Sequence, residues 1–275
     1  MKKLNHALIM MLMLVIGGVG VYADESWICP TCGEERTSNF CTEDGTPKQN
    51  SSQTVNNASG NSSGNSSGGY AVSFSDVSIG DTITLGTYEQ DNIISNGPED
   101  IEWIVLDVQD DRALMISKYE LDVMSYDYFL FHVSWETCSL RSWLNHDFLN
   151  EAFTSDEKAL IPAVTLTEEA NSEYGTNSAG VTQDRVFLLS IPEVLKYFPS
   201  DNERKCTQTE YAYAKGVQYS EDMIYGWWWL RSSSSADSYA TFVIYNGSIT
   251  DAVLAPGDYN ICVRPALWIN LGGSD

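Results

Sequence analysis

The sequence predicts an α+β protein, and three observations support this class. Segments with strand character open and close the long C-terminal part of the chain, segments with helical spacing lie between them, and the composition supports a packed core. Of the 275 residues, 43% are hydrophobic and 12% aromatic, which excludes wholesale disorder and a collagen-like architecture. We expect antiparallel sheets, a few short helices, and one antiparallel system in which the two ends of the domain pair.

Three predicted strands open the domain as a β-meander. They cover residues 82–88, 101–108 and 113–119, and a polar turn separates the last two. Each strand is short and rich in β-branched, aromatic or aliphatic residues, as paired strands usually are.

Helical signals fill the middle of the domain. One apolar stripe with helical spacing consists of Leu140, Trp143, Leu144, Phe148, Leu149 and Phe153. Thr154 with Glu157, and Ser190 with Glu193, have the spacing of a capping box, which predicts that a helix begins at each pair. A strand at 186–189 leads into a helix at 192–198, and a further helix at 209–215 ends at a glycine.

The last third of the chain returns to strands. They are expected at 227–231, 239–245, 249–254 and 262–271. Asn246-Gly247 is a strong hairpin signal, because both central residues of the preferred two-residue turn need a positive φ.

The N-terminus has the three parts of an export signal. Two lysines precede an apolar run at 7–16, and Val21-Tyr22-Ala23 offers a small-residue cleavage site. Residues 1–23 are therefore predicted to be a signal peptide and the remainder to be secreted or displayed on a bacterial cell surface. An uncleaved signal anchor is the alternative, and membrane attachment is expected only in that case.

A cysteine module follows at 24–47. Cys29 and Cys32 stand in a Cys-x-x-Cys-Gly sequence, and Cys41 and Asp44 repeat the spacing, so the stretch resembles a zinc ribbon. Three thiolates and one carboxylate would hold a structural zinc ion, although the carboxylate departs from the usual four cysteines. A disulfide between the first two cysteines is the alternative, because exported proteins meet an oxidising environment.

A flexible linker separates this module from the main domain. Residues 48–69 are almost entirely Asn, Ser, Gly, Gln and Thr, a composition that cannot pack into a core. The main domain is therefore assigned to 70–275.

The charge excludes one class of partner. Lys+Arg number 15 and Asp+Glu 38, and the net charge is -23 at pH 7. A nucleic acid backbone attracts basic surfaces, so nucleic acid binding is not expected.

Five motifs in the main domain recur in order in a known family. They are Ile79-Gly80-Asp81-Thr82-Ile83, Ile101-Glu102-Trp103-Ile104-Val105-Leu106, Leu140-Arg141-Ser142-Trp143-Leu144-Asn145, Trp228-Trp229-Leu230-Arg231-Ser232 and Val263-Arg264-Pro265-Ala266-Leu267-Trp268. Over about residues 70–272 the chain resembles the clostridial domain of unknown function 6273. The last two motifs, with the hairpin between them, are more distantly similar to the C-type-lectin-like fold of formylglycine-generating (sulfatase-modifying) proteins. This resemblance implies a C-type-lectin-like mixed domain, and fold alone does not imply function.

Catalytic patterns are weak. Only His132 and His146 follow the export signal, and no Gly-x-Ser-x-Gly elbow occurs. The copper-dependent oxidase activity of the formylglycine-generating proteins would need a close cysteine pair after Trp-Leu-Arg-Ser, and residues 232–246 contain none. Cys138, Cys206 and Cys262 are widely spaced, and one pair among them is open to a disulfide.

The tryptophan-rich strand is the predicted binding surface. Aromatic and arginine side chains carry much of the binding energy for sugars and protein partners. The candidate ligand-binding residues are Trp227, Trp229, Arg231, Tyr239, Asp258 and Tyr259. In the alternative interpretation the indoles are buried and Arg231 pairs with a buried carboxylate.

The sequence thus predicts a non-catalytic, secreted or cell-surface module that binds an extracellular glycan or protein. The alternatives are an extracellular enzyme, related to formylglycine-generating proteins or acting on glycans, and a purely structural envelope domain.

Overall fold

The structure is a computed structural model. It describes residues 74, 77–128, 134–168, 180–216, 225–234, 240–250 and 261–272, together with the backbone of two short strands, β1 (Trp27–Ile28) and β2 (Glu35–Arg36). The predicted signal peptide and linker lie outside these residues. Within them the protein has mixed helices and largely antiparallel sheets, which confirms the α+β class.

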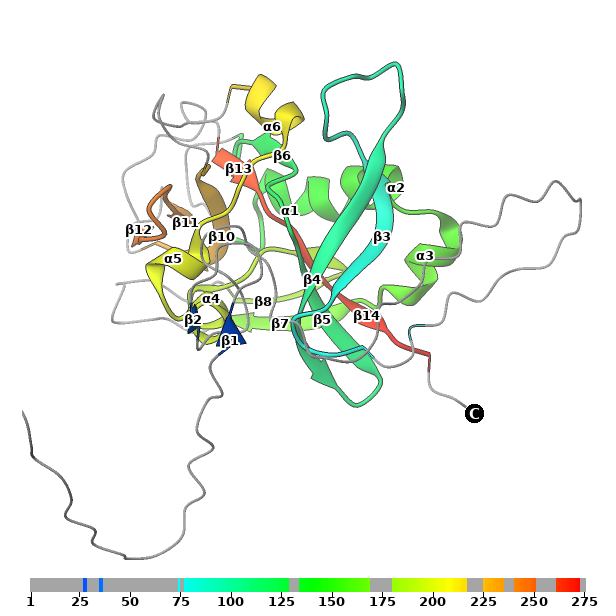
Figure 1. Ribbon diagram of the computed structural model, residues 1–275, viewed down its shortest axis with the longest axis horizontal. Coiled ribbons are helices and arrows are strands. Elements are labelled where there is room, and N and C mark those ends of the chain that lie inside the picture. Colours follow the sequence, from blue (N-terminus) through cyan, green and yellow to red (C-terminus); the bar gives the residue numbers. More distant parts are fainter. Residues whose placement is uncertain are drawn as a thin grey trace, which may run out of the picture.

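Five antiparallel strands form the first sheet in the order β3-β4-β5-β14-β9. Their bounds are β3 (Thr82–Tyr88), β4 (Glu99–Gln109), β5 (Arg112–Ser117), β9 (Val186–Phe187) and β14 (Ala266–Asn270). The predicted meander is therefore present, and the C-terminal strand returns to pair with it. In Figure 1 the helices α2 and α3 lie beside β3 at one side of the molecule.

The second sheet has the order β12-β11-β10-β13-β6. It contains β6 (Asp122–Met124), β10 (Trp228–Ser233), β11 (Ala240–Val243), β12 (Ile249–Thr250) and β13 (Ile261–Val263). β10 and β13 run parallel, and the other pairs are antiparallel. Strands β10–β12 lie on the opposite side of the molecule from α2 and α3 (Figure 1).

The expectation of one antiparallel system is wrong in one respect. The predicted strand at 262–271 is divided at Arg264 and Pro265 into β13 and β14, which belong to different sheets. Proline has no N–H for a strand ladder, and here the Pro265 carbonyl accepts from Ser117 N at 2.9 Å while the chain crosses between the sheets. The two sheets are thus joined through the Val-Arg-Pro motif.

The predicted hairpin at Asn246-Gly247 is confirmed, but its turn is not the expected two-residue type, because Gly247 has a positive φ and Asn246 does not. β11 and β12 pair antiparallel with Val243 opposite Ile249, and Gly247 has a φ of 88°. A Cβ atom on this glycine would lie 1.6 Å from the carbonyl oxygen of Asp201. The position therefore requires glycine for both conformation and space.

The predicted apolar stripe lies on one continuous helical segment. It comprises α1 (Ser139–Trp143), the π-helical η1 (Leu144–Phe148) and α2 (Leu149–Ala152). Leu140, Leu144 and Phe148 are buried. The Phe153 ring that ends the stripe lies 6.1 Å from the Trp103 ring of β4, so this segment covers the first sheet.

Both predicted capping boxes are present. Thr154 caps α3 (Ser155–Leu160) and Ser190 caps α4 (Ile191–Tyr197). The helix α6 (Glu210–Ala214) is followed by Gly216 at a φ of 87°, as the predicted C-terminal glycine implies. The sequence analysis did not identify α5 (Asp201–Arg204), although Ser200 and Glu203 form the same kind of capping box.

Three strands of the main domain were not predicted, and β6 is one of them. β7 (Val164–Glu168) and β8 (Gly180–Asp184) form a separate two-stranded antiparallel sheet. In β7 the exposed threonines alternate with the buried Val164 and Leu166, which is the pattern of a half-buried strand, whereas in β8 Val181 is exposed and Thr182 is buried.

Candidate functional site

The tryptophan-rich strand lies inside the protein. Trp228 is 0% exposed, Trp229 4% and Arg231 3%. β10 is the central strand of its sheet, and every residue from Trp228 to Ser233 is buried, so neither face of the strand is open to solvent. Trp229 Nε1 donates to Met124 O at 2.8 Å, and its ring meets those of Tyr126 and Phe242 edge-on.

Arg231 holds β10 to the helix α4. Its backbone N donates to Leu189 O at 3.0 Å, its Nη1 donates to Leu188 O at 2.8 Å, and the same nitrogen pairs with the carboxylate of Glu193. The structure therefore follows the alternative in which this arginine is a core residue paired with a carboxylate. Trp229 and Arg231 do not offer a surface to a ligand, because packing of β10 between covered faces encloses both side chains.

Trp227 differs from its neighbours because it is half-buried. Its ring stacks on Phe242 with an interplanar angle of 15° and a centroid distance of 5.5 Å. Its carbonyl accepts from Cys262 N at 2.7 Å, so it lies where β13 joins β10. The other predicted binding residues, Tyr239, Asp258 and Tyr259, lie outside the described residues, as do the side chains of Cys29, Cys32, Cys41 and Asp44.

A buried polar group lies next to this strand. We call it the Glu120 cluster, and it consists of Glu120, Cys206, Gln208, Cys262 and Arg264. Glu120 precedes β6, and Cys262 is in the middle of β13. Cys206 and Gln208 lie on the connection between α5 and α6, where Gln208 forms a parallel β-bridge with Glu120. The backbone bonds Glu120 N to Thr207 O and Gly226 N to Cys206 O hold these segments together.

Glu120 is completely buried, and both of its carboxylate oxygens lack a hydrogen-bond partner by geometry among the described residues. Its carboxylate lies under Gly226, where a Cβ atom would be 1.9 Å from Glu120 Oε2 and 3.0 Å from Gln208 Oε1. Burial raises the pKa of Glu120 to about 8, and the neighbouring Cys262 thiol and the Arg264 charge only partly oppose this rise. The raised pKa favours the protonated form of Glu120 at neutral pH.

Arg264 is enclosed between two aromatic rings. Its guanidinium lies 5.1 Å from the Trp228 ring and 5.3 Å from the Phe198 ring, and its Nε donates to Ser117 O at 3.1 Å. These contacts stabilise a buried cation. The arginine of the Val-Arg-Pro motif thus connects both sheets to the end of α4.

The three cysteines of the main domain are free and buried. Burial raises the pKa of Cys138 and of Cys206 to about 12, and burial together with the negative charge of Glu120 raises the pKa of the Cys262 thiol. A thiol is a nucleophile only as the thiolate. These three groups are therefore packed as protonated thiols and are not activated for reaction.

Residues of the Leu-Arg-Ser-Trp-Leu-Asn motif tie the helical segment to distant strands. Arg141 Nε donates to Asp184 Oδ1 at 2.6 Å, and the same aspartate accepts from Trp135 Nε1 at 2.9 Å. Asn145 Nδ2 donates to Val186 O at 2.8 Å, and its Oδ1 accepts from Arg185 N at 2.8 Å. The polar residues of this motif thus have structural roles.

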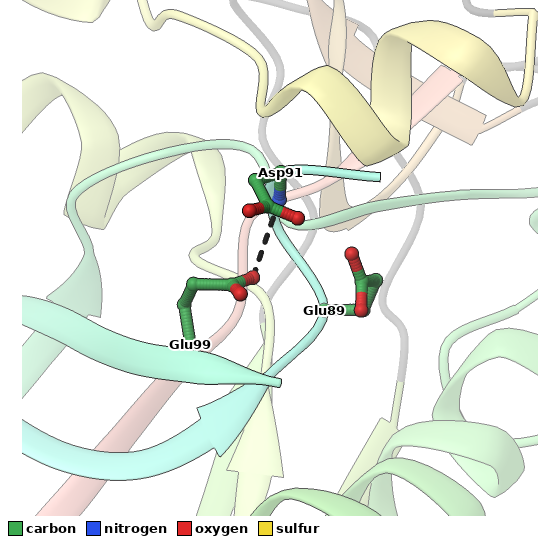
Figure 2. Close-up of side chains that lie close together, drawn as sticks. All are labelled: Glu89, Asp91 and Glu99. Carbon is green, nitrogen blue, oxygen red and sulfur yellow. Dashed lines mark hydrogen bonds between the residues drawn. The ribbon is translucent and has the colours of Figure 1, made fainter. Parts of the chain in front are cut away.

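One acidic group in the described residues is suited to hold a cation. Glu89, Asp91 and Glu99 each place one carboxylate oxygen within 4.8 Å of the others, and we call them the acidic triad. They come from the end of β3, the connection that follows it, and the start of β4. Figure 2 shows the carboxylates of Asp91 and Glu99 facing each other, with the backbone N of Asp91 donating to Glu99 Oε2 at 3.2 Å.

The sequence analysis identified neither the Glu120 cluster nor the acidic triad. With 38 acidic residues in the chain, no local feature distinguishes the few whose surroundings are unusual. The nearest signal is the alternation Glu120-Leu121-Asp122-Val123, in which charged residues interrupt an apolar strand.

These features define an α+β domain of two five-stranded sheets whose interior contains buried arginines and tryptophans. The chain belongs to the family described as domain of unknown function 6273 (DUF6273), whose model matches residues 110–271. The match covers more than half of the chain, from the β4–β5 turn to the end of β14. No curated protein and no solved structure matches the chain.

Proposed function

We propose that this protein is a secreted or cell-surface module that binds an extracellular glycan or protein and catalyses no reaction. The observation that carries the proposal is the half-buried Trp227, which directly precedes the central strand β10 and stacks on Phe242 of β11. An indole supported in this way by a second ring offers a rigid apolar surface to a sugar ring or a side chain. The burial of the free thiols further favours a binding function over a catalytic function that uses a cysteine.

The scaffold we propose is C-type-lectin-like. Two features support it: the C-terminal strand pairs with the N-terminal meander, and the second sheet carries the Trp-Leu-Arg-Ser strand, the glycine hairpin and the Val-Arg-Pro strand in sequence. Because Cys262 pairs with Trp228, β13 starts at the end of β10 at which Trp227 lies. Tyr239 directly precedes β11, and Asp258 and Tyr259 closely precede β13, so we propose that they complete the surface around Trp227.

We expect Trp227→Ala to weaken ligand binding at least tenfold, because an anchoring aromatic residue contributes on the order of 2 kcal/mol at a binding hot spot. The measurement is a glycan and mucin array probed with the full chain, followed by titration of the best ligand. Circular dichroism and thermal unfolding of each variant show that the fold is retained.

Trp268→Ala is the matched control, because Trp268 is also half-buried but lies in the first sheet, where Arg112 covers it at 4.9 Å. It should bind as the wild type does. Equal binding by wild type and Trp227→Ala would exclude Trp227 as the anchor, and failure of the wild type to bind any ligand would favour a structural envelope domain.

We further propose that residues 24–47 form a zinc-ribbon-like head. β1 and β2 pair antiparallel with Ile28 opposite Glu35, so Cys29 and Cys32 both belong to the connection between the two strands. A zinc knuckle needs its first two ligands on such a connection. The proposed ligands are Cys29, Cys32, Cys41 and Asp44, and the ion has a structural role.

Elemental analysis of the full chain is expected to find one zinc ion per molecule. Cys32→Ser should abolish the zinc, and Asp44→Ala should lower its retention during dialysis against a chelator, because one of four ligands is lost. Glu43→Ala, next to the proposed ligand, is the control and should retain zinc. A zinc-free protein with a disulfide between Cys29 and Cys32 would establish the alternative.

Secretion follows from the predicted signal peptide and remains a proposal. Within the described ranges, no helix combines the length and apolar character that a membrane crossing requires. The net charge of -23 supports an extracellular partner other than nucleic acid.

A further inference from the structure

The acidic triad lies at the base of the β3–β4 connection, which projects from the first sheet at the top of Figure 1. Backbone and amide donors fix two of the three carboxylates. Gln90 N donates to Glu99 Oε2 at 2.7 Å, Ile93 N donates to Asp91 Oδ1 at 2.8 Å, and Asn96 Nδ2 donates to Asp91 Oδ2 at 2.8 Å. Both carboxylates are therefore held in defined positions.

Glu89 is the unusual member. Its side chain faces the other two carboxylates (Figure 2), the residue is only 9% exposed, and its Oε1 is buried with no hydrogen-bond partner by geometry among the described residues. Burial and the charges of Glu99 and Asp91 raise the pKa of Glu89. A buried carboxylate oxygen without a donor costs free energy unless a positive charge approaches it.

In the part of the chain that the structure describes, no side chain supplies that charge. Among the residues that the structure describes, no lysine or arginine forms an ion pair with Glu89, Asp91 or Glu99. Lys215, which follows α6, is engaged with Asp122 at 2.7 Å. Three carboxylates thus converge without a cation from the described chain.

We propose that the acidic triad binds a calcium ion. A Ca²⁺ ion takes six to eight oxygen ligands at about 2.3–2.6 Å, so ligand oxygens on opposite sides of it are roughly 5 Å apart. Triad oxygens that lie within 4.8 Å of one another fit around such an ion. The unpartnered Glu89 Oε1 becomes a ligand, and solvent completes the coordination sphere.

The three carboxylate ligands, and the adaptable connection that carries them, favour Ca²⁺ over Mg²⁺. Mg²⁺ demands a near-ideal octahedron with ligands about 2.0–2.1 Å away and usually keeps several waters. The triad instead offers three carboxylates, each able to bind through one or both oxygens, on a connection that adapts to a larger ion. Because only three protein side chains contribute, we expect a dissociation constant of about 10⁻⁴ to 10⁻³ M, as in extracellular calcium modules.

Binding has a defined structural consequence. The triad sits beside Gln90, whose carbonyl accepts from Tyr211 N of α6 at 3.0 Å. An ion that joins Glu89, Asp91 and Glu99 would therefore fasten the β3–β4 connection to both strands and, through Gln90, to α6. Calcium should raise the thermal stability of the protein, because a ligand that binds only the folded state stabilises it.

The test is calorimetric titration of the full chain with CaCl2 in 150 mM NaCl and 1 mM MgCl2, with thermal unfolding in parallel. We expect one site in the stated affinity range and a Tm increase of about 3 to 6 °C at a tenfold excess of Ca²⁺ over the dissociation constant. Equal concentrations of additional Mg²⁺ should give less than half of that increase.

Two variants and one control locate the site. Glu89→Gln and Glu99→Gln should each raise the dissociation constant at least tenfold, and Glu89→Gln should also raise the Tm without calcium, because it removes one of three like charges. Asp111→Asn changes an exposed carboxylate at the other end of β4 and should bind calcium as the wild type does.

The proposal does not depend on the glycan or protein ligand proposed above. It is overturned if the wild type shows no calcium binding up to 10 mM, if both variants bind calcium with unchanged affinity, or if magnesium raises the Tm as much as calcium. Since Glu89→Gln keeps the size of the side chain and removes repulsion, it tests the site even if Glu99→Gln fails to fold.

Discussion

Replacing Glu120 with glutamine is expected to make the protein more stable above pH 8 and to flatten the pH dependence of its stability. Burial raises the pKa of Glu120 from an ordinary value of 4.5 to about 8. The folded state therefore keeps a proton that the unfolded chain releases. Folding stability is lost as the pH rises between these two values, by about 1.4 kcal/mol per pH unit from this group.

Glu120→Gln removes this loss, because the amide has the size of the acid and never ionises. At pH 5, where Glu120 is protonated in the folded protein, the variant should match the wild type to within about 1 kcal/mol. Above pH 8 it should be more stable by roughly 3 to 6 kcal/mol. Urea unfolding of the full chain at pH 5, 7 and 9 measures the difference.

Glu151→Gln is the matched control, since Glu151 is exposed on α2. It should leave the pH profile of stability unchanged. A wild-type protein whose stability does not fall between pH 5 and pH 9, or a Glu120→Gln variant that falls in parallel with it, would show that Glu120 is solvated or ionised in the fold.

Arg231→Ala is expected to lower the free energy of unfolding by about 3 kcal/mol, the lower end of the range for breaking a buried ion pair. Arg231 is 3% exposed, and its Nη1 donates to Leu188 O and pairs with the Glu193 carboxylate. The value falls at the lower end because the Glu193 side chain is 27% exposed and water can solvate it after the change. The midpoint of urea unfolding should fall with an unchanged slope.

Arg112→Ala provides the comparison for this prediction. Arg112 is half-buried and lies over Trp268 at 4.9 Å in the first sheet, so its loss should cost about 1 kcal/mol or less. If Arg231→Ala unfolds at the same urea concentration as the wild type and instead loses a ligand, Arg231 belongs to a binding surface. The two outcomes separate a core residue from a recognition residue in one experiment.

The fate of the tryptophan-rich strand shows why the site was harder to predict than the fold. The alternation of Trp227, Trp229 and Arg231 predicts that they share one face of a strand. It does not reveal that β10 is the central strand of its sheet or that α4 packs against it. Whether an indole contacts ligand or core depends on neighbours that are distant in sequence.

The acidic triad and the Glu120 cluster make the same point for charged residues. Glu89 and Glu99 are ten residues apart, and Glu120 and Cys262 are separated by most of the domain. The pKa values of Glu89 and Glu120 depend on burial and on charged groups that folding brings close to them. Composition reports only that carboxylates are abundant.

The sequence by itself determined the features that depend on near neighbours along the chain. These include the α+β class, the helix starts at Thr154 and Ser190, the hairpin at Asn246-Gly247, and membership of the DUF6273 family. Only the tertiary structure decided that the chain crosses between two sheets at Arg264 and Pro265, that Arg231 is internal, and which carboxylates meet. Hydrogen-bonded turns and caps are local interactions, whereas burial and electrostatic environment arise from contacts between segments that only folding brings together.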